Sequence, residues 1–167
     1  MAAKKAGNGE IQEKIETNEE GVQATMNNKA VKFRDFLDEN KINVFNIEAL
    51  ADELHTAVFR SRIEAKGQIL PMAVIIDDSV FTIIRTQIVS GVPTDKQDKL
   101  VIFLNALNEK YKIFKYYLRA DGIVFLDVCI PFVEETFDSK MLQLMLSVLV
   151  KHLEETYGDI MNEIWSK

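Results

Sequence analysis

The spacing of apolar residues predicts three consecutive β-strands in the first half of the chain. From residue 57 the pattern changes, and over residues 59–65 apolar or small residues alternate with charged ones, which is typical of a strand with one face in water. Residues 69–76 are apolar on both faces and predict a more central strand, and residues 80–89 alternate again. Lys66-Gly67 and Asp77-Asp78-Ser79 are turn sequences between them. We therefore expect an antiparallel meander.

A helix and a hairpin are predicted after this meander. Thr94 and Gln97 have the spacing of a capping box at the start of a helix. Two further apolar runs, 113–118 and 123–130, flank an Asp-Gly pair at positions 121 and 122, which is a strong hairpin signal. These runs are expected to be the fourth and fifth strands.

Helices are also predicted at both ends of this region. Residues 31–39 have apolar positions at near-helical spacing, and Asp138 is a good N-cap for a final helix that reaches about Trp165. The segment 45–54 has a weaker pattern and is expected to be helical or irregular. The predicted fold class is therefore α+β, with a five-stranded antiparallel sheet and the chain order α-β-β-β-α-β-β-α.

The first 30 residues have a different composition from the rest of the chain. They contain few large apolar groups, so they bury too little surface to offset the entropy of ordering. We predict a flexible tail over residues 1–30 and a single domain over residues 31–167. An alternative stays open, because Ile11, Ile15 and Val22 fall on one helical stripe with Met26 and would suit a docking helix.

Charge and cysteine content limit the classes of partner. The 167 residues contain 26 acidic and 20 basic side chains, for a net charge of −6, so no basic surface is expected to bind nucleic acid or an anionic membrane. The longest apolar stretch, 141–150, is too short to span a bilayer. The only cysteine, Cys129, lies in an apolar strand and is expected to be a buried thiol. With no export signal, these features predict a cytoplasmic protein.

Residues with catalytic or metal-binding chemistry are few. His55, His152 and Cys129 lack the spacing of a metal site, and the chain has no glycine-rich phosphate loop and no nucleophile motif. We therefore expect no enzyme activity, no metal and no cofactor. Asn105 and Asn108 are the polar pair of most interest, expected to hydrogen-bond the start of the fourth strand, with a partner contact as the alternative.

The predicted order of elements resembles the YbjN-like family, whose members are labelled as bacterial sensory transduction regulators. The resemblance covers roughly residues 31–165 and is carried best by the stretch LVIFLNALNEKYKIFKYYLRADGIVFLDVCIPF, with its two asparagines, aromatic strand and Asp-Gly hairpin. It implies the fold of the type III secretion chaperones and a protein-binding role. It implies no catalytic residues.

The chain has more apolar surface than its predicted helices can cover. A sheet has two faces, and residues 141–150 are apolar on more sides than a surface helix needs. We expect a homodimer, a bound protein client or both. The candidate surface consists of Met72, Leu104, Asn105, Asn108, Met141, Leu144, Met145 and Val148.

Two other functions remain open at this point. The first is a small-ligand binder or enzyme with a pocket between the sheet and the last helix, where Tyr116, Asp127 and His152 are the available polar groups. The second is a structural domain whose tail alone binds a partner. The leading hypothesis is a non-catalytic protein-binding regulator or chaperone-like adaptor.

Overall fold

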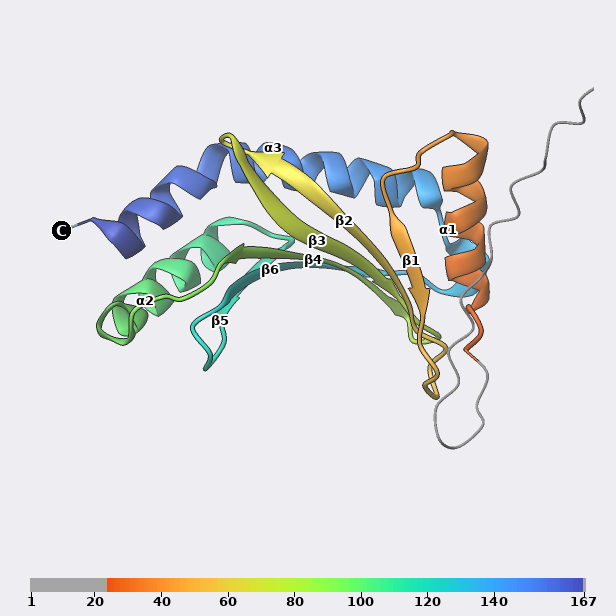
Figure 1. Cartoon of the computed structure of the whole chain (residues 1–167), viewed down its shortest axis with the longest axis horizontal. Helices are drawn as coiled ribbons and strands as arrows, with labels where there is room; N and C mark the ends of the chain where they lie inside the picture. The colour runs from red at the N-terminus through yellow and green to blue at the C-terminus, as the bar shows by residue number, and fades with distance from the viewer. Residues whose placement is uncertain (1–23, 167) are drawn as a thin grey trace, which may run out of the picture.

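One antiparallel sheet organises the part of the chain that the computed structural model describes, residues 24–166 (Figure 1). Its strands follow the order β1-β2-β3-β4-β6-β5. The predicted α+β class is confirmed, but the sheet has six strands and not five. The strands are β1 Asn46–Ala49, β2 Ala57–Ala65, β3 Gln68–Ile76, β4 Phe81–Val89, β5 Phe114–Leu118 and β6 Val124–Pro131.

The additional strand is β1, in the segment expected to be helical or irregular. Ile47 pairs with Phe59 and Ala49 with Ala57, so these residues share the inner face of the sheet. Asn46 and Glu48 lie on the outer face, where Asn46 is exposed and Glu48 is partly buried. The strand has only four residues. Alternation over so few positions is too short to be distinguished from irregular sequence.

Three α-helices accompany the sheet: α1 Asn28–Glu39, α2 Thr94–Lys110 and α3 Ser139–Trp165, with a short 3₁₀ turn at Glu134–Thr136. The Asp138 side chain accepts a hydrogen bond from the backbone of Lys140, so the predicted N-cap of α3 is confirmed. The predicted capping box of α2 is wrong. Pro93 is its N-cap, and the Gln97 side chain donates to the carbonyl of Val92.

The folded region begins before residue 31. Residues 1–23, most of the predicted tail, lie outside the described residues. The Asn27 side chain caps α1 by accepting from the backbone of Ala30, and its amide group donates to the carbonyls of His55 and Ile76, each at 2.9 Å. Lys29 is 3% exposed. The helix therefore starts three positions earlier than predicted, because Asn27 joins it to the sheet.

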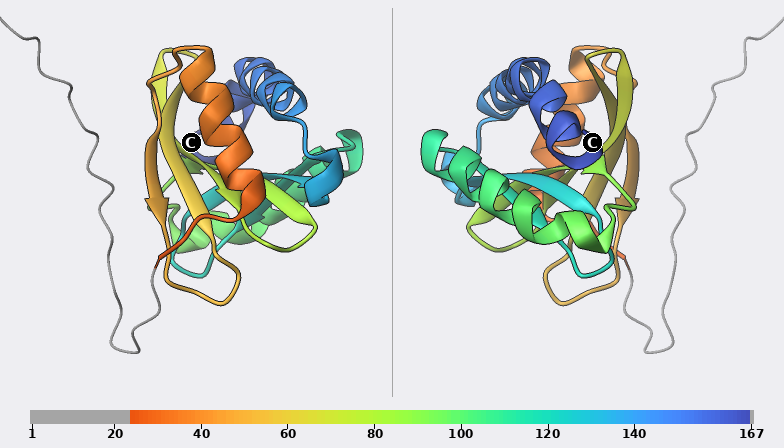
Figure 2. Two further views of the ribbon diagram at one scale, coloured as in Figure 1. Left: turned by 90° about the vertical axis from the view of Figure 1, so that its right-hand side faces the viewer. Right: turned by 90° about the vertical axis from the view of Figure 1, so that its left-hand side faces the viewer.

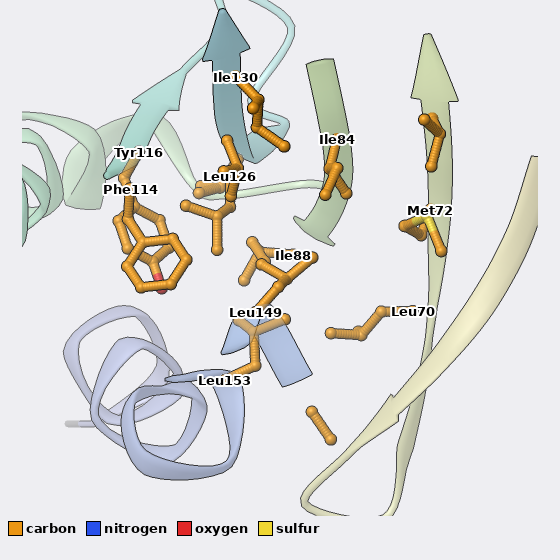
Figure 3. Close-up of a cluster of buried hydrophobic side chains, with 14 of the residues drawn as sticks. Leu70, Met72, Ile84, Ile88, Phe114, Tyr116, Leu126, Ile130, Leu149 and Leu153 are labelled. Atoms are coloured by element: carbon orange, nitrogen blue, oxygen red, sulfur yellow. The ribbon is translucent and has the colours of Figure 1, made fainter. Parts of the chain in front are cut away.

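The helices leave the outer face of the sheet uncovered in the described residues. α1 and α3 lie on the inner face, and Figure 2 shows both helices on that side. Apolar side chains from β3, β4, β5 and β6 point toward α3 (Figure 3), where Leu149 and Leu153 are fully buried. α2 runs along β5, the last strand of the sheet.

We expect Asn27→Ala to lower the free energy of unfolding by about 2 kcal/mol. The change removes a helix cap and the side-chain hydrogen bonds to the carbonyls of Ile76 and His55, and each loss alone costs about 1 kcal/mol or more. The matched control is Asn28→Ala, since Asn28 is exposed and its side chain bonds only Glu134 among residues 24–166. Guanidinium unfolding measures both. Equal effects of the two substitutions would contradict the assignment.

Candidate functional site

The eight residues predicted as one surface do not lie together. Met72 and Leu104 are 6% and 2% exposed and belong to the core, so their assignment to a surface is wrong. Met72 is on the inner face of β3, and Leu104 is on the buried stripe of α2. The exposed members on α3 are Met141 at 41% and Leu144 at 54%, with two half-buried neighbours, Met145 and Val148.

The two asparagines of α2 have different environments. Asn108 confirms the predicted structural role, because its side chain donates to the carbonyl of Tyr116 at 3.0 Å and accepts from the Tyr116 backbone at 2.7 Å. These bonds satisfy the backbone of β5 at the sheet edge, so α2 covers that edge. Asn105 is exposed and faces away from the sheet.

A buried polar cluster joins β5 to α3. The Tyr116 hydroxyl lies 2.8 Å from Nε2 of His152 and 3.2 Å from Oγ1 of Thr156. The imidazole stacks on Phe114 with ring centroids 3.8 Å apart and meets Tyr111 edge-on at 4.4 Å. Figure 3 shows Phe114 and Tyr116 pointing together toward α3. The cluster is closed to solvent, since His152 is 4% exposed and Tyr116 3%.

Burial shifts the pKa values of His152 and Tyr116 away from neutral pH. Desolvation, helped by the charge of Lys110, lowers the pKa of His152 from 6.5 to about 4. Burial also raises the pKa of Tyr116 well above its ordinary value. Both side chains are therefore neutral at pH 7 and act as hydrogen-bonding partners inside the core.

Asp127 lies on the opposite face of the sheet from this cluster. Its carboxylate binds the Arg85 guanidinium through two bonds of 2.9 and 2.8 Å and accepts from the Tyr117 hydroxyl at 3.3 Å. The bond to Asp127 raises the pKa of Arg85. Of the three polar groups of the alternative ligand pocket, only Tyr116 and His152 are therefore brought together, and Asp127 is separated from them by the sheet.

Cys129 is exposed on this outer face, so the prediction of a buried thiol is wrong. It pairs with Ile83 of β4. The neighbours of Cys129 in β6, Val128 and Ile130, are buried. The inner face of β6 is covered by α3, whereas no described helix covers its outer face. The amino-acid composition of β6 does not show which of its two faces is buried.

An exposed apolar stripe runs along α2 on the side away from the sheet. Ile102 is 73% exposed and Val101 50%. Ala106 lies one turn after Ile102 and is also exposed, with Asn105 beside it. Ile113, three residues after the helix, is 42% exposed. This stripe was not predicted, since the candidate surface included Leu104 of α2, which is buried, and not its exposed neighbours Val101 and Ile102.

An apolar hollow of about 230 Å³ lies between α1 and α3. Its walls include Phe36 and Val44 on one side and Leu146 and Val150 of α3 on the other, with the Ser147 hydroxyl as one of two polar groups. The Ser147 hydroxyl donates to the carbonyl of Gln143 within α3. No charged side chain lines the hollow, so it suits an uncharged apolar group.

A second, more polar hollow of about 430 Å³ lies where β1 begins. It is lined by Val44, Asn46, Arg60, Ser61 and Arg62. Arg60 pairs with Glu48 at 3.0 Å, whereas no described residue forms an ion pair with Arg62. Val44, which is 66% exposed, lines both hollows.

Residues 24–166 contain neither a cluster of metal ligands nor a membrane-spanning helix. No three His, Cys, Asp or Glu side chains in this range are grouped to hold a metal ion. No helix in the same range is long and apolar enough to cross a bilayer. No family model and no curated protein matches this sequence.

Proposed function

We propose that this chain is a non-catalytic, cytoplasmic protein-binding module that forms a homodimer and acts as a regulator or chaperone-like adaptor. The observation that carries the proposal is the exposed apolar stripe on α2, formed by Val101, Ile102 and Ala106 with Ile113 beyond the helix. Contiguous exposed apolar groups of this kind mark interaction surfaces in proteins.

The charges at the two ends of α2 favour a second copy as the occupant. Asp95 and Asp98 lie in its first turns, where the two lysines, Lys96 and Lys99, instead bind Ser166 and Glu163 at the end of α3. Lys110 is the last residue of the helix, and Lys112 follows two residues later. When two copies of α2 pack antiparallel, the acidic end of each helix meets the basic end of the other. The small side chain of Ala106 allows close approach at the centre. Such an isologous contact is the commonest arrangement in homo-oligomers.

The resemblance to the YbjN-like family and the distribution of apolar surface support the adaptor role. Met141 and Leu144 remain exposed on α3, on a different element from the proposed dimer stripe. A dimer that covers α2 therefore leaves apolar surface for another protein. The closed His152 cluster offers no open pocket for a substrate, so we propose no enzymatic function.

The test is Ile102→Asp, which we expect to convert a dimer into a monomer by light scattering. Position 102 lies at the centre of the proposed contact. The introduced carboxylate would therefore be buried close to the same carboxylate of the second copy, and an unpaired charge is costly to bury. The matched control is Ile69→Asp. Ile69 is 66% exposed on β3 and outside α2, so this variant is expected to remain a dimer.

Two results would count against the proposal. A wild-type protein that is monomeric at all accessible concentrations removes the homodimer. A dimer that survives Ile102→Asp but dissociates in the Ile69→Asp control moves the contact from α2 to the sheet. Circular dichroism of each variant checks that the fold is retained.

A further inference from the structure

One edge of the sheet is covered, and the other is partly open. At one edge, Asn108 of α2 binds the backbone of Tyr116 in β5. At the other edge, β1 pairs with β2 only from Ala57 to Arg60, although β2 continues to Ala65. Beyond Arg60, β2 has β3 as its only strand partner in the described chain. An open strand edge is a template for pairing with another extended chain.

We propose that the open edge of β2, from Arg62 to Ala65, binds an extended peptide segment of a partner protein by strand addition, and that the segment carries a carboxylate for Arg62. The proposal rests on the protein-binding function above and names the chemistry of the partner. About four residues of the peptide pair with β2, in the position that β1 would occupy if it were longer. Backbone hydrogen bonds supply affinity in this mode, and side-chain hollows on alternate positions supply specificity.

The outward side chains of the added strand meet the polar hollow. Because neighbouring residues in a strand alternate between faces, the peptide residue opposite Arg62 lies on the outer face with it. Arg62 lines the polar hollow and forms no ion pair within residues 24–166. The neighbouring Arg60 adds a second positive charge, partly balanced by Glu48. This position favours aspartate or glutamate.

The inward side chains of the added strand meet α3. The backbone of Lys66 at the end of β2 donates to the Glu154 carboxylate, which fixes where β2 passes over this helix. Ser147 lies seven residues before Glu154, or about 10 Å along a helix, and Ile63 lies three residues before Lys66, also about 10 Å along a strand. Ser147 and Val150 line the apolar hollow. The peptide residue opposite Ile63 therefore points toward that hollow and favours an apolar side chain.

The probe is a fluorescein-labelled octapeptide of alternating valine and threonine with one central aspartate, titrated into the full chain by fluorescence anisotropy. We expect saturable binding, weakened at least tenfold by Arg62→Glu. A peptide with lysine in place of the aspartate is expected to reverse this preference. The matched control, Lys115→Glu, makes the same charge change at an exposed residue of β5, at the opposite edge of the sheet, and is expected to leave both affinities unchanged.

A second pair of measurements tests the backbone pairing. The same peptide with alternate amides N-methylated is expected not to bind, because it lacks donors for the edge. In hydrogen exchange, the amides of residues 62–65 are expected to exchange fast in the free protein, apart from those bonded to β3, and to slow when the peptide binds.

Several outcomes would overturn the inference. These are no binding at millimolar peptide, equal affinities for wild type and Arg62→Glu, or an N-methylated peptide that binds as well as its parent. Complete protection of residues 62–65 in the free protein shows that the chain itself or a second copy already covers this edge. Light scattering distinguishes this proposal from the α2 dimer. Arg62→Glu is expected to remain a dimer, so a failure of peptide binding to the intact dimer would overturn the strand-addition proposal and not the dimer.

Discussion

Phe59→Ala is expected to lower the free energy of unfolding by about 3–5 kcal/mol, the range for removing a fully buried aromatic side chain. Phe59 is 0% exposed on β2. Its ring meets that of Phe33 from α1 at 4.9 Å and that of Phe45, just before β1, at 6.4 Å, both edge-on. The substitution therefore removes the contact that joins α1, β1 and the sheet. Guanidinium unfolding measures the change.

The control for this prediction is Ile69→Ala on the neighbouring strand. Ile69 is 66% exposed, so its truncation removes little buried surface and is expected to change stability by less than about 0.5 kcal/mol. If both substitutions cost the same, the three rings do not form the packed centre of this end of the core. A reduced slope of the unfolding transition in Phe59→Ala would indicate that α1 and β1 had detached before the rest unfolded.

These aromatic contacts also explain which part of the fold was predictable from the sequence. The strands of the meander and the hairpin are alternating or apolar runs of five to nine residues between turn sequences, and the structure confirms them at β2 to β6. β1 has four residues, and its place in the sheet depends on Phe45 packing against Phe33 and Phe59. Contacts between distant parts of the chain leave no local pattern, so the strand was missed.

The candidate surface was harder to predict than the fold. The spacing of apolar residues predicts that α2 is amphipathic. It does not reveal that these residues form two separate stripes, one in the core with Leu104 and one in solvent with Ile102. For the same reason, Cys129 was placed inside, because both faces of β6 are largely apolar and only the position of α3 makes one of them the core. Which face is covered is a property of the tertiary structure.

Acidification is expected to destabilise the protein through His152. The folded-state pKa of this imidazole is lowered from 6.5 to about 4, because burial among Phe114, Tyr111 and Tyr116 disfavours its charged form. The unfolded chain therefore takes up a proton below pH 6.5, whereas the folded protein does so only near pH 4. The contribution of neutral His152 to the free energy of unfolding is fully present above pH 6.5 and is lost as the pH drops. The loss is about 2 kcal/mol at pH 5 and about 3 kcal/mol below pH 4.

The measurement is guanidinium unfolding of wild type and His152→Leu between pH 7.5 and pH 5. Carboxylates that titrate in this range contribute to both proteins, so the difference between the two stabilities isolates His152. The leucine variant keeps the Tyr116 hydroxyl beside Thr156 and is expected to lose about 2 kcal/mol of the acid dependence. His55→Gln is the control, because His55 is half-exposed and bonds only Asp78 through its side chain in the described region. Parallel pH curves for wild type and His152→Leu would show that the buried imidazole is protonated as readily as in the unfolded chain, and that α3 does not exclude water from Tyr116.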